Sequence, residues 1–233
     1  MIQAPSIQHS IKPNSGVDVE KKPQNSQSRT QANWVGSFLK GLLDYLLVVP
    51  GLFFITPLFT LIALMVKLES PGPIFYRHRV VGRNGREFNA YKFRTMYINA
   101  EDRLASQPHL QVGLKTNYSL KHDPRLTRTG YLLHKFGLDD LPQLFNILKR
   151  DMSLVGPRIV TYSELAKYGP YRDCLLSVLP GLIGLWQVQS GSDLNFEDRI
   201  GMDMAYIQNW SVLSDIQIIF RTVPALVKGD SVH

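Results

Sequence analysis

The feature that most constrains this chain is a run of apolar residues without a single charge. Residues 45–66 read YLLVVPGLFFITPLFTLIALMV. A helix needs about 20 such residues to cross the hydrocarbon core of a bilayer, whereas a helix on a soluble core usually keeps a polar stripe. We therefore expect residues 34–68 to insert into a membrane, between a tail over 1–33 and a folded domain over 69–233.

The segment over 1–33 differs sharply in composition from the rest. It is rich in Gln, Ser, Asn, Pro and Lys and contains almost no aromatic residues. Such a segment cannot bury enough apolar surface to fold, so we expect a disordered tail. We expect no secretory signal, because no apolar run follows within the usual reach.

The way in which the apolar run enters the membrane is open on physical grounds. Pro50 and Pro57 lie inside it, and each removes a backbone hydrogen bond and bends a helix. Positive charges lie on both sides, so no inside and outside can be assigned. A helix that breaks near Thr56-Pro57 and returns would put both flanks on the cytoplasmic face, with Asp44 at the interface. A kinked spanning helix is the alternative.

The region after the apolar run predicts an α+β fold that is mostly helical. Residues 70–96 predict a β-hairpin, because IFYRHRVV and EFNAYKF have strand composition and flank an Asn-Gly turn. Residues 107–130 read as a long basic loop. Helices are expected near 97–106, 139–149, 161–178, 196–209 and 213–228.

The charge balance limits the classes of partner. The formal net charge is +7, which suits a phosphate-rich partner such as nucleic acid, an anionic membrane or a phosphorylated substrate. Nucleic acid is the poorest fit, because no motif of the usual binding modules occurs and the apolar run would have no role. The single cysteine, Cys174, excludes an intrachain disulfide and suits a reducing compartment.

Two adjacent carboxylates, Asp139 and Asp140, precede an amphipathic pattern. Leu141, Leu144 and Phe145 share one face of a helix that Pro142 tolerates in its first turn. Asp139 then fits the N-cap and Asp140 the first turn, which is a purely structural role. The same position keeps a carboxylate ionised, two acids suit Mg²⁺, and an aspartate can attack phosphorus. The pattern alone permits both roles.

Arg158 follows a fixed Gly156-Pro157 turn close to the acids in sequence, so we expect it to contact substrate phosphate. Residues 206–228 are apolar enough to lie on a membrane interface, but could equally pack on the domain core. No ligand spacing connects His78, His122 and His134, so we interpret them as surface or packing residues.

Several motifs in order over residues 38–228 resemble the bacterial sugar transferases, the monotopic polyprenyl-phosphate phosphoglycosyl transferases. They are the apolar segment with Thr56-Pro57, SPGPIFYRHRVVGRNG, FNAYKFRTM, DPRLTRTGYLLHKFGLDDLPQLFNILKRDMSLVGPR, LPGLIGLWQV and DLNFEDRIGMDMAYIQNW. The resemblance implies transfer of a sugar-1-phosphate from a nucleotide-diphosphate sugar, such as a UDP-hexose, to membrane-bound polyprenyl phosphate. This reaction initiates exopolysaccharide or glycan synthesis at the cytoplasmic face of the bacterial inner membrane.

The resemblance also implies roles for individual residues. Asp139 would be the nucleophile, Asp140 would help to hold Mg²⁺, and Arg158 would face the donor. The family's re-entrant helix, broken at a Ser-Pro pair, favours re-entry at Thr56-Pro57. Further phosphate or headgroup contacts are expected at Lys92, Arg94, Arg77 and Arg79.

The chain also departs from the family pattern. Asp140 replaces the usual Glu, Ile159 replaces a Pro, and Thr56 replaces a Ser. Arginines are lost where Leu179 and the segment Gln189-Ser190-Gly191 stand. These losses affect donor recognition and leave one alternative, a non-catalytic membrane-associated component of a polysaccharide assembly complex.

Overall fold

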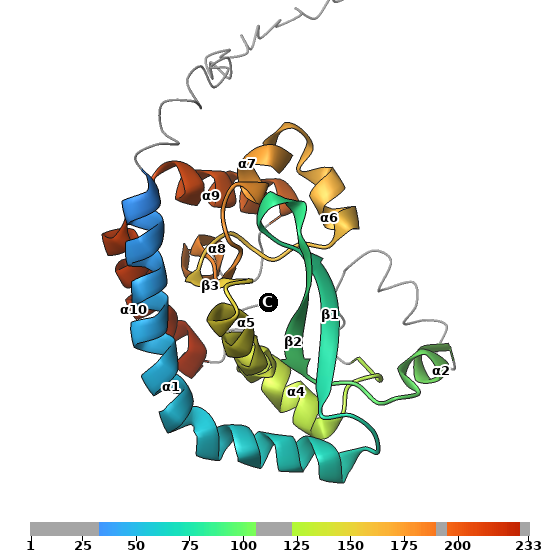
Figure 1. The fold of residues 1–233 in the computed structure, drawn as a ribbon. Coiled ribbons are helices and arrows are strands. Elements are labelled where there is room, and N and C mark those ends of the chain that lie inside the picture. The colour runs from blue at the N-terminus through green and yellow to red at the C-terminus, as the bar shows by residue number, and fades with distance from the viewer. Residues whose placement is uncertain (1–32, 106–122, 190–194, 229–233) are drawn as a thin grey trace, which may run out of the picture.

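The computed structural model describes residues 33–105, 123–189 and 195–228, so the predicted tail over 1–32 and His122 lie outside the described residues. Its elements confirm an α+β fold that is mostly helical (Figure 1). In chain order they are α1 Asn33–Glu69, β1 Phe75–Val81, η1 Arg83–Gly85, β2 Glu87–Phe93, α2 Ala100–Ala105, α4 Arg128–Lys135, η2 Leu138–Gln143, α5 Leu144–Leu148, β3 Ser153–Val155, α6 Tyr162–Lys167, η3 Gly169–Tyr171, α7 Arg172–Leu176, β4 Gly181–Ile183, α8 Leu185–Gln189, α9 Phe196–Gln208 and α10 Val212–Lys228.

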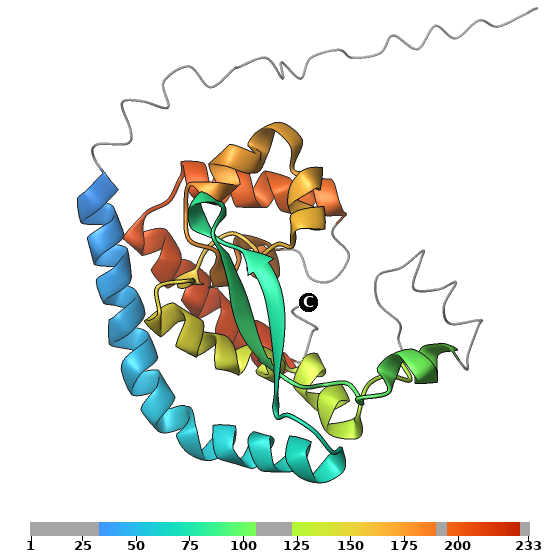
Figure 2. The same cartoon turned by 45° about the vertical axis from the view of Figure 1, so that its right-hand side comes forward.

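Helix α1 contains the whole apolar run and both prolines. By length and composition it could cross a membrane, and only 11% of its most apolar window is buried in the protein. Figures 1 and 2 show that it runs along one side of the domain and then bends sharply. Pro57 lacks the N–H of a regular helix, and the Thr56 hydroxyl donates to Leu52 O at 2.7 Å. Both features bend helices.

The two limbs of α1 pack on the same domain. Val48, before the bend, lies in a core cluster with Ile147 of α5 and with Met152. Ile62, after the bend, lies in a second cluster with Phe93 of β2 and Leu133 of α4.

Polar groups fix the two ends of α1 to this domain. Near the start, Lys40 Nζ lies 2.6 Å from Asp215 Oδ2 of α10. Asp44, which we placed at the membrane interface, is buried and accepts hydrogen bonds from Ser153 Oγ at 2.9 Å and Leu154 N at 3.0 Å. At the other end, the Glu69 carboxylate accepts from Thr129 N at 2.9 Å and so caps α4.

The predicted hairpin is confirmed. Strands β1 and β2 pair antiparallel from Phe75↔Phe93 to Val81↔Glu87. The turn between them places Asn84 at φ 59° and Gly85 at φ 75°, which is the left-handed conformation that an Asn-Gly pair adopts readily. Figure 2 shows the hairpin standing in front of the helices.

A second, parallel pair, β3 and β4, joins Ser153 to Gly181 and Val155 to Ile183. This pair was not predicted, because strands of three residues are too short to show a periodic pattern.

The predicted helices are partly wrong at their boundaries. The segment 139–149 begins as the 3₁₀ helix η2 and becomes α-helical only at Leu144. The segment 161–178 is interrupted at Gly169, whose φ is 50° and which precedes Pro170. Helix α4 begins at Arg128, inside the predicted loop, because Thr127 accepts from Gly130 N and caps it.

The C-terminal stretch packs on the domain core, which confirms one of the two roles that we considered. Tyr206 and Ile218 are buried in a cluster with Val155, and Tyr206 donates to Asp215 at 2.8 Å. Leu213 and Phe220 are 64% and 73% exposed on α10. The inner face of α10 therefore packs on the domain, and its outer face remains uncovered.

The Asp44 contact tests whether α1 is an integral part of the fold. We expect Asp44→Ala to lower the free energy of unfolding by about 2–4 kcal/mol, because it leaves buried donors of Ser153 and Leu154 without an acceptor. Unfolding of the detergent-solubilised protein, followed by circular dichroism, measures this. Ser37→Ala, on an exposed position of the same helix, should change little, and equal stability of the Asp44 variant and wild type would contradict the role of this contact.

Candidate active site

The acid pair lies on the 3₁₀ helix η2, directly after the end of α4. The N-cap position is held by Gly137, whose φ is 64°. The prediction that Asp139 is the N-cap is therefore wrong. A left-handed glycine reverses the chain after α4, so the turn starts at Leu138 and Asp139 lies inside it.

Asp139 faces the interior. It is 4% exposed, and its Oδ2 lies 3.8 Å from Nδ1 of His134 on α4. The interpretation of His134 as a surface or packing residue missed this proximity, because sequence spacing does not show that α4 and η2 fold against each other.

Asp140 is held by two side chains. Its Oδ1 lies 2.8 Å from Lys92 Nζ of β2, and Gln143 Nε2 donates to the same oxygen. Gln143 is 1% exposed. The structure thus brings Lys92, a predicted phosphate contact, directly to the acid pair, and it adds Gln143, which the sequence analysis did not single out.

Strand alternation separates the other basic residues of the hairpin. Lys92 pairs with Tyr76, and His78 pairs with Ala90, so Tyr76 and His78 lie on the same face as Lys92. Arg77 and Arg79 lie on the opposite face, where Arg79 forms an ion pair with Glu87. The structure therefore does not bring Arg77 and Arg79 to the acid pair.

His78 lies on the hairpin face that carries Lys92. Burial, and then the charge of Lys92, lower its pKa, with smaller effects from Asp140 and Arg158. These interactions place the imidazole within electrostatic reach of Asp140 and Arg158. The sequence analysis missed His78, because its position depends on the pairing of β1 with β2.

Arg94, unlike Lys92, is buried against the segment that follows α1. It is 8% exposed and donates from Nη2 to Ser70 O at 2.6 Å and from Nη1 to Pro71 O at 2.9 Å. These carbonyls follow the end of α1. The guanidinium therefore joins the hairpin to the membrane helix, away from the acid pair.

Arg158 follows a close contact between two backbones. Gly156 N donates to Ile183 O at 2.9 Å, and Gly181 N donates to Pro157 O at 2.8 Å. A Cβ added to Gly156 would lie 2.7 Å from Gly181 N, so only glycine permits this approach. The predicted turn is present, and the Arg158 guanidinium lies 5.2 Å from the centre of the Trp186 ring.

A buried carboxylate supports this turn from below. Asp203 of α9 is 1% exposed, accepts from Arg158 N at 3.3 Å and from the Tyr168 hydroxyl at 2.8 Å. Burial raises the pKa of Asp203 to about 6, against the opposing effect of these hydrogen bonds and of the charges of Arg158 and Arg199. The sequence analysis did not single out Asp203, because its contacts with Arg158 and Tyr168 depend on the fold.

The donor set at the acid pair fits Mg²⁺ bound together with substrate. Within the described ranges there is no group of three or more His, Cys, Asp or Glu side chains that could hold a metal by itself. Mg²⁺ is commonly held by one or two carboxylates and by substrate phosphates. Asp139 and Asp140 offer such hard oxygen atoms.

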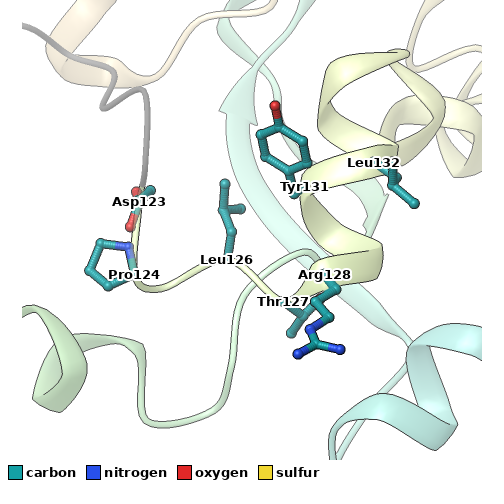
Figure 3. A pocket seen from close by; sticks show the side chains of 7 residues that line it. All are labelled: Asp123, Pro124, Leu126, Thr127, Arg128, Tyr131 and Leu132. Atoms are coloured by element: carbon teal, nitrogen blue, oxygen red, sulfur yellow. The ribbon is translucent and has the colours of Figure 1, made fainter.

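A separate hollow lies beside the start of α4. It has a volume of about 600 Å³. In Figure 3, Tyr131 and Leu132 project from α4, while Asp123, Pro124 and Leu126 come from the segment before it. None of its lining residues belongs to the acid pair.

Comparison with known proteins identifies the family. The sequence model described as bacterial sugar transferase matches residues 35–229. The chain belongs to this family.

Among curated relatives, the chain is 41% identical to the exopolysaccharide production protein ExoY of Sinorhizobium fredii, over 82% of the chain and 87% of the relative. It is 38% identical to the undecaprenyl-phosphate galactose phosphotransferase of Salmonella typhimurium, over 84% of the chain and 42% of the relative. It is 33% identical to the UDP-glucose:undecaprenyl-phosphate glucose-1-phosphate transferase of Escherichia coli, over 83% and 41%. The resemblance seen in the sequence is confirmed, and the chain is a transferase associated with membranes.

The contact between Lys92 and Asp140 generates a test of the site. We expect Lys92→Met to lower transferase activity by at least about tenfold, because Asp140 loses the cation that orients it. Stability should change by less than about 1 kcal/mol, since the pair is partly exposed. Arg86→Gln removes an exposed charge from the hairpin turn and serves as the control; equal activity of Lys92→Met and wild type would exclude this role.

The raised pKa of Asp203 predicts a pH dependence of stability. Between about pH 4 and pH 6 the folded protein keeps a proton on Asp203 that the unfolded chain has lost. The contribution of Asp203 to stability therefore falls as the pH rises through this range. We expect the stability of wild type relative to Asp203→Asn to fall by up to about 1.4 kcal/mol per pH unit there. Chemical unfolding at several pH values measures it, and parallel curves would contradict the assignment.

Proposed function

We propose that this protein transfers a sugar-1-phosphate from a nucleotide-diphosphate sugar to polyprenyl phosphate through an aspartyl-phosphosugar intermediate. The observation that carries the proposal is the acid pair, with Asp139 buried beside His134 and Asp140 fixed by Lys92. A helix cap needs one acid. The second acid, held by a lysine and a buried glutamine, supports a catalytic role.

In the first step, a carboxylate oxygen of Asp139 attacks the β-phosphorus of the donor. The bond from this phosphorus to the bridging oxygen breaks, and its electron pair leaves with the nucleoside monophosphate. In the second step, a phosphate oxygen of polyprenyl phosphate attacks the same phosphorus. The bond to Asp139 breaks, so the carboxylate is regenerated and the polyprenyl diphosphate sugar is released.

Charged side chains of this chain support both steps. Lys92 orients Asp140 and offsets negative charge near the donor. Arg158, carried on its turn, is suited to bidentate contact with phosphate. We propose that Asp140, with Asp139 beside it, holds Mg²⁺. When bound, Mg²⁺ would neutralise charge on the donor diphosphate.

The substrates are proposed from the relatives' names and from charge. Two relatives are named for undecaprenyl phosphate, with galactose and glucose respectively. A net charge of +7 suits a phosphorylated donor and an anionic lipid. We propose a UDP-hexose as donor, polyprenyl phosphate as acceptor, and initiation of exopolysaccharide synthesis as the role.

The contacts of α1 support a re-entrant helix. Lys40 near its start and Glu69 at its end both bind the same domain, and the helix bends between them. A straight spanning helix would hold these ends on opposite sides of the bilayer. We propose that both ends and the catalytic domain lie on the cytoplasmic face of the inner membrane, with the exposed face of α10 against the lipid surface.

The alternative, a non-catalytic component of an assembly complex, rests on the arginines lost at Leu179 and after Trp186. The ordered contacts of Asp139, Asp140 and Lys92 favour catalysis.

The decisive experiment follows the nucleotide that is released. Wild-type protein with a UDP-hexose, polyprenyl phosphate and Mg²⁺ should release UMP. Asp139→Asn should lower this rate by at least about a thousandfold, because the amide cannot act as the nucleophile. Asp173→Asn, on an exposed position of α7, is the control. Without lipid, intact-protein mass spectrometry should detect the phosphosugar adduct on wild type only.

Three results would contradict the proposal. Release of UDP would mean an ordinary glycosyl transfer. Unchanged activity of Asp139→Asn would remove the nucleophile. Absence of release from a folded, lipid-bound wild type with every donor would favour the non-catalytic alternative. Chelation of Mg²⁺ should stop the reaction, and activity in its absence would exclude the metal.

A further inference from the structure

A second cluster of basic side chains surrounds Trp186. The guanidinium of Arg158 lies 5.2 Å from the centre of the indole ring, and the guanidinium of Arg199 lies 4.9 Å from it. Trp186 is 3% exposed, so it supports the two cations and leaves no open face for a nucleobase. Residues from the β3–α6 connection, α8 and α9 thus converge at one place.

Two guanidiniums lie in this cluster, and the charges of Glu164 and Asp203 act on Arg199 in the opposite sense to that of Arg158. Asp203 is buried beneath the cluster and accepts from Arg158 N and from the Tyr168 hydroxyl. None of the ion pairs within the described residues involves Arg158 or Arg199. Arg199 Nε is buried and has no hydrogen-bond partner among the described residues.

Such an arrangement opposes the stability of the fold. Burial, and then the charge of Arg158, lower the pKa of Arg199. Cation–π contact with an indole offsets part of this repulsion, but an unsatisfied guanidinium nitrogen still costs free energy. The planar fork of a guanidinium suits the oxygens of a phosphate group, and two such groups lie at the same indole ring here.

The cluster lies within electrostatic reach of the acid pair. The charges of Lys92, Asp140 and Arg158 all act on His78, which lies on the hairpin face that carries Lys92. A donor diphosphate has two phosphorus atoms, of which one must reach Asp139. The arginines can therefore hold the phosphate that leaves with the nucleoside.

We propose that Arg199 joins Arg158 in a two-arginine site for the nucleoside-side phosphate of the donor. This inference rests on the proposed function and deepens it, because Arg199 then contributes to donor recognition in a chain that lacks arginines at Leu179 and after Trp186. The lipid phosphate offers the same chemistry, so the experiment measures the two substrates separately.

The test uses the full chain in detergent. Calorimetry without lipid measures the binding of UDP, and of inorganic pyrophosphate as a probe without the nucleoside. We expect Arg199→Gln to weaken both by roughly tenfold to a hundredfold. Arg199→Lys should recover only part, because it keeps the charge and loses the planar fork. The KM for the donor should rise, while the KM for polyprenyl phosphate should stay unchanged.

Arg86→Gln is the matched control, since it removes the same charge from an exposed position. Unchanged affinity of Arg199→Gln for UDP would overturn the proposal, and a rise in the lipid KM alone would assign the site to the lipid phosphate. If Arg199→Gln lowers the melting temperature, and Arg199→Lys restores both the melting temperature and the full affinity for UDP, then Arg199 has a structural role only. Binding of UDP requires no turnover, so a wild type that binds UDP through Arg199 but releases no UMP would refute the transfer reaction and leave the site intact.

Discussion

The structure depends on polar contacts that hold an apolar helix to a polar domain. Helix α1 exposes most of its apolar window, and a free helix of this kind would have no fixed relation to the site. The ion pair of Lys40 with Asp215 and the hydrogen bonds of Asp44 hold one limb. Glu69 caps α4 at the other end. Because the two ends are fixed to one body, the bend determines how the catalytic domain meets the lipid surface.

The same contacts determine where the chemistry lies. Helix α4, which Glu69 caps, ends at Lys135. The left-handed Gly137 that follows starts the turn that carries Asp139 and Asp140. Arg94 joins the hairpin to the segment that follows α1. Lys92, two residues earlier in the hairpin, lies 2.8 Å from Asp140. In the reaction that we propose, a lipid-anchored acceptor and a soluble donor must meet at one phosphorus atom. Anchoring the acid pair and its lysine to the membrane helix holds the site at the surface where the acceptor lies.

Local signals in the sequence were sufficient for part of the fold. The Asn-Gly turn and the alternating residues around it gave the hairpin, and charge-free length gave the membrane helix. The start of the helix near Asp139 was wrong, because a left-handed glycine and tertiary contacts selected a 3₁₀ turn over the N-cap that propensity favours. The breaks at Gly169 and the short parallel strands were missed, since each depends on contacts with distant segments. The histidines were set aside for the same reason, because His134 and His78 reach the acids only through folding.

By itself, the sequence determined the family, because several of its motifs occur in order over most of the chain. Its adjacent carboxylates permitted both a structural and a catalytic role. It also determined that the hairpin would form, because its turn is local. The tertiary structure decided which cations serve the acids. Strand alternation turned Lys92 toward Asp140 and turned Arg77 and Arg79 away. The packing of α8 and α9 brought Arg158 and Arg199 to the same indole ring. Residue type fixes what a side chain can do, but only the pairing of distant segments fixes what it can reach.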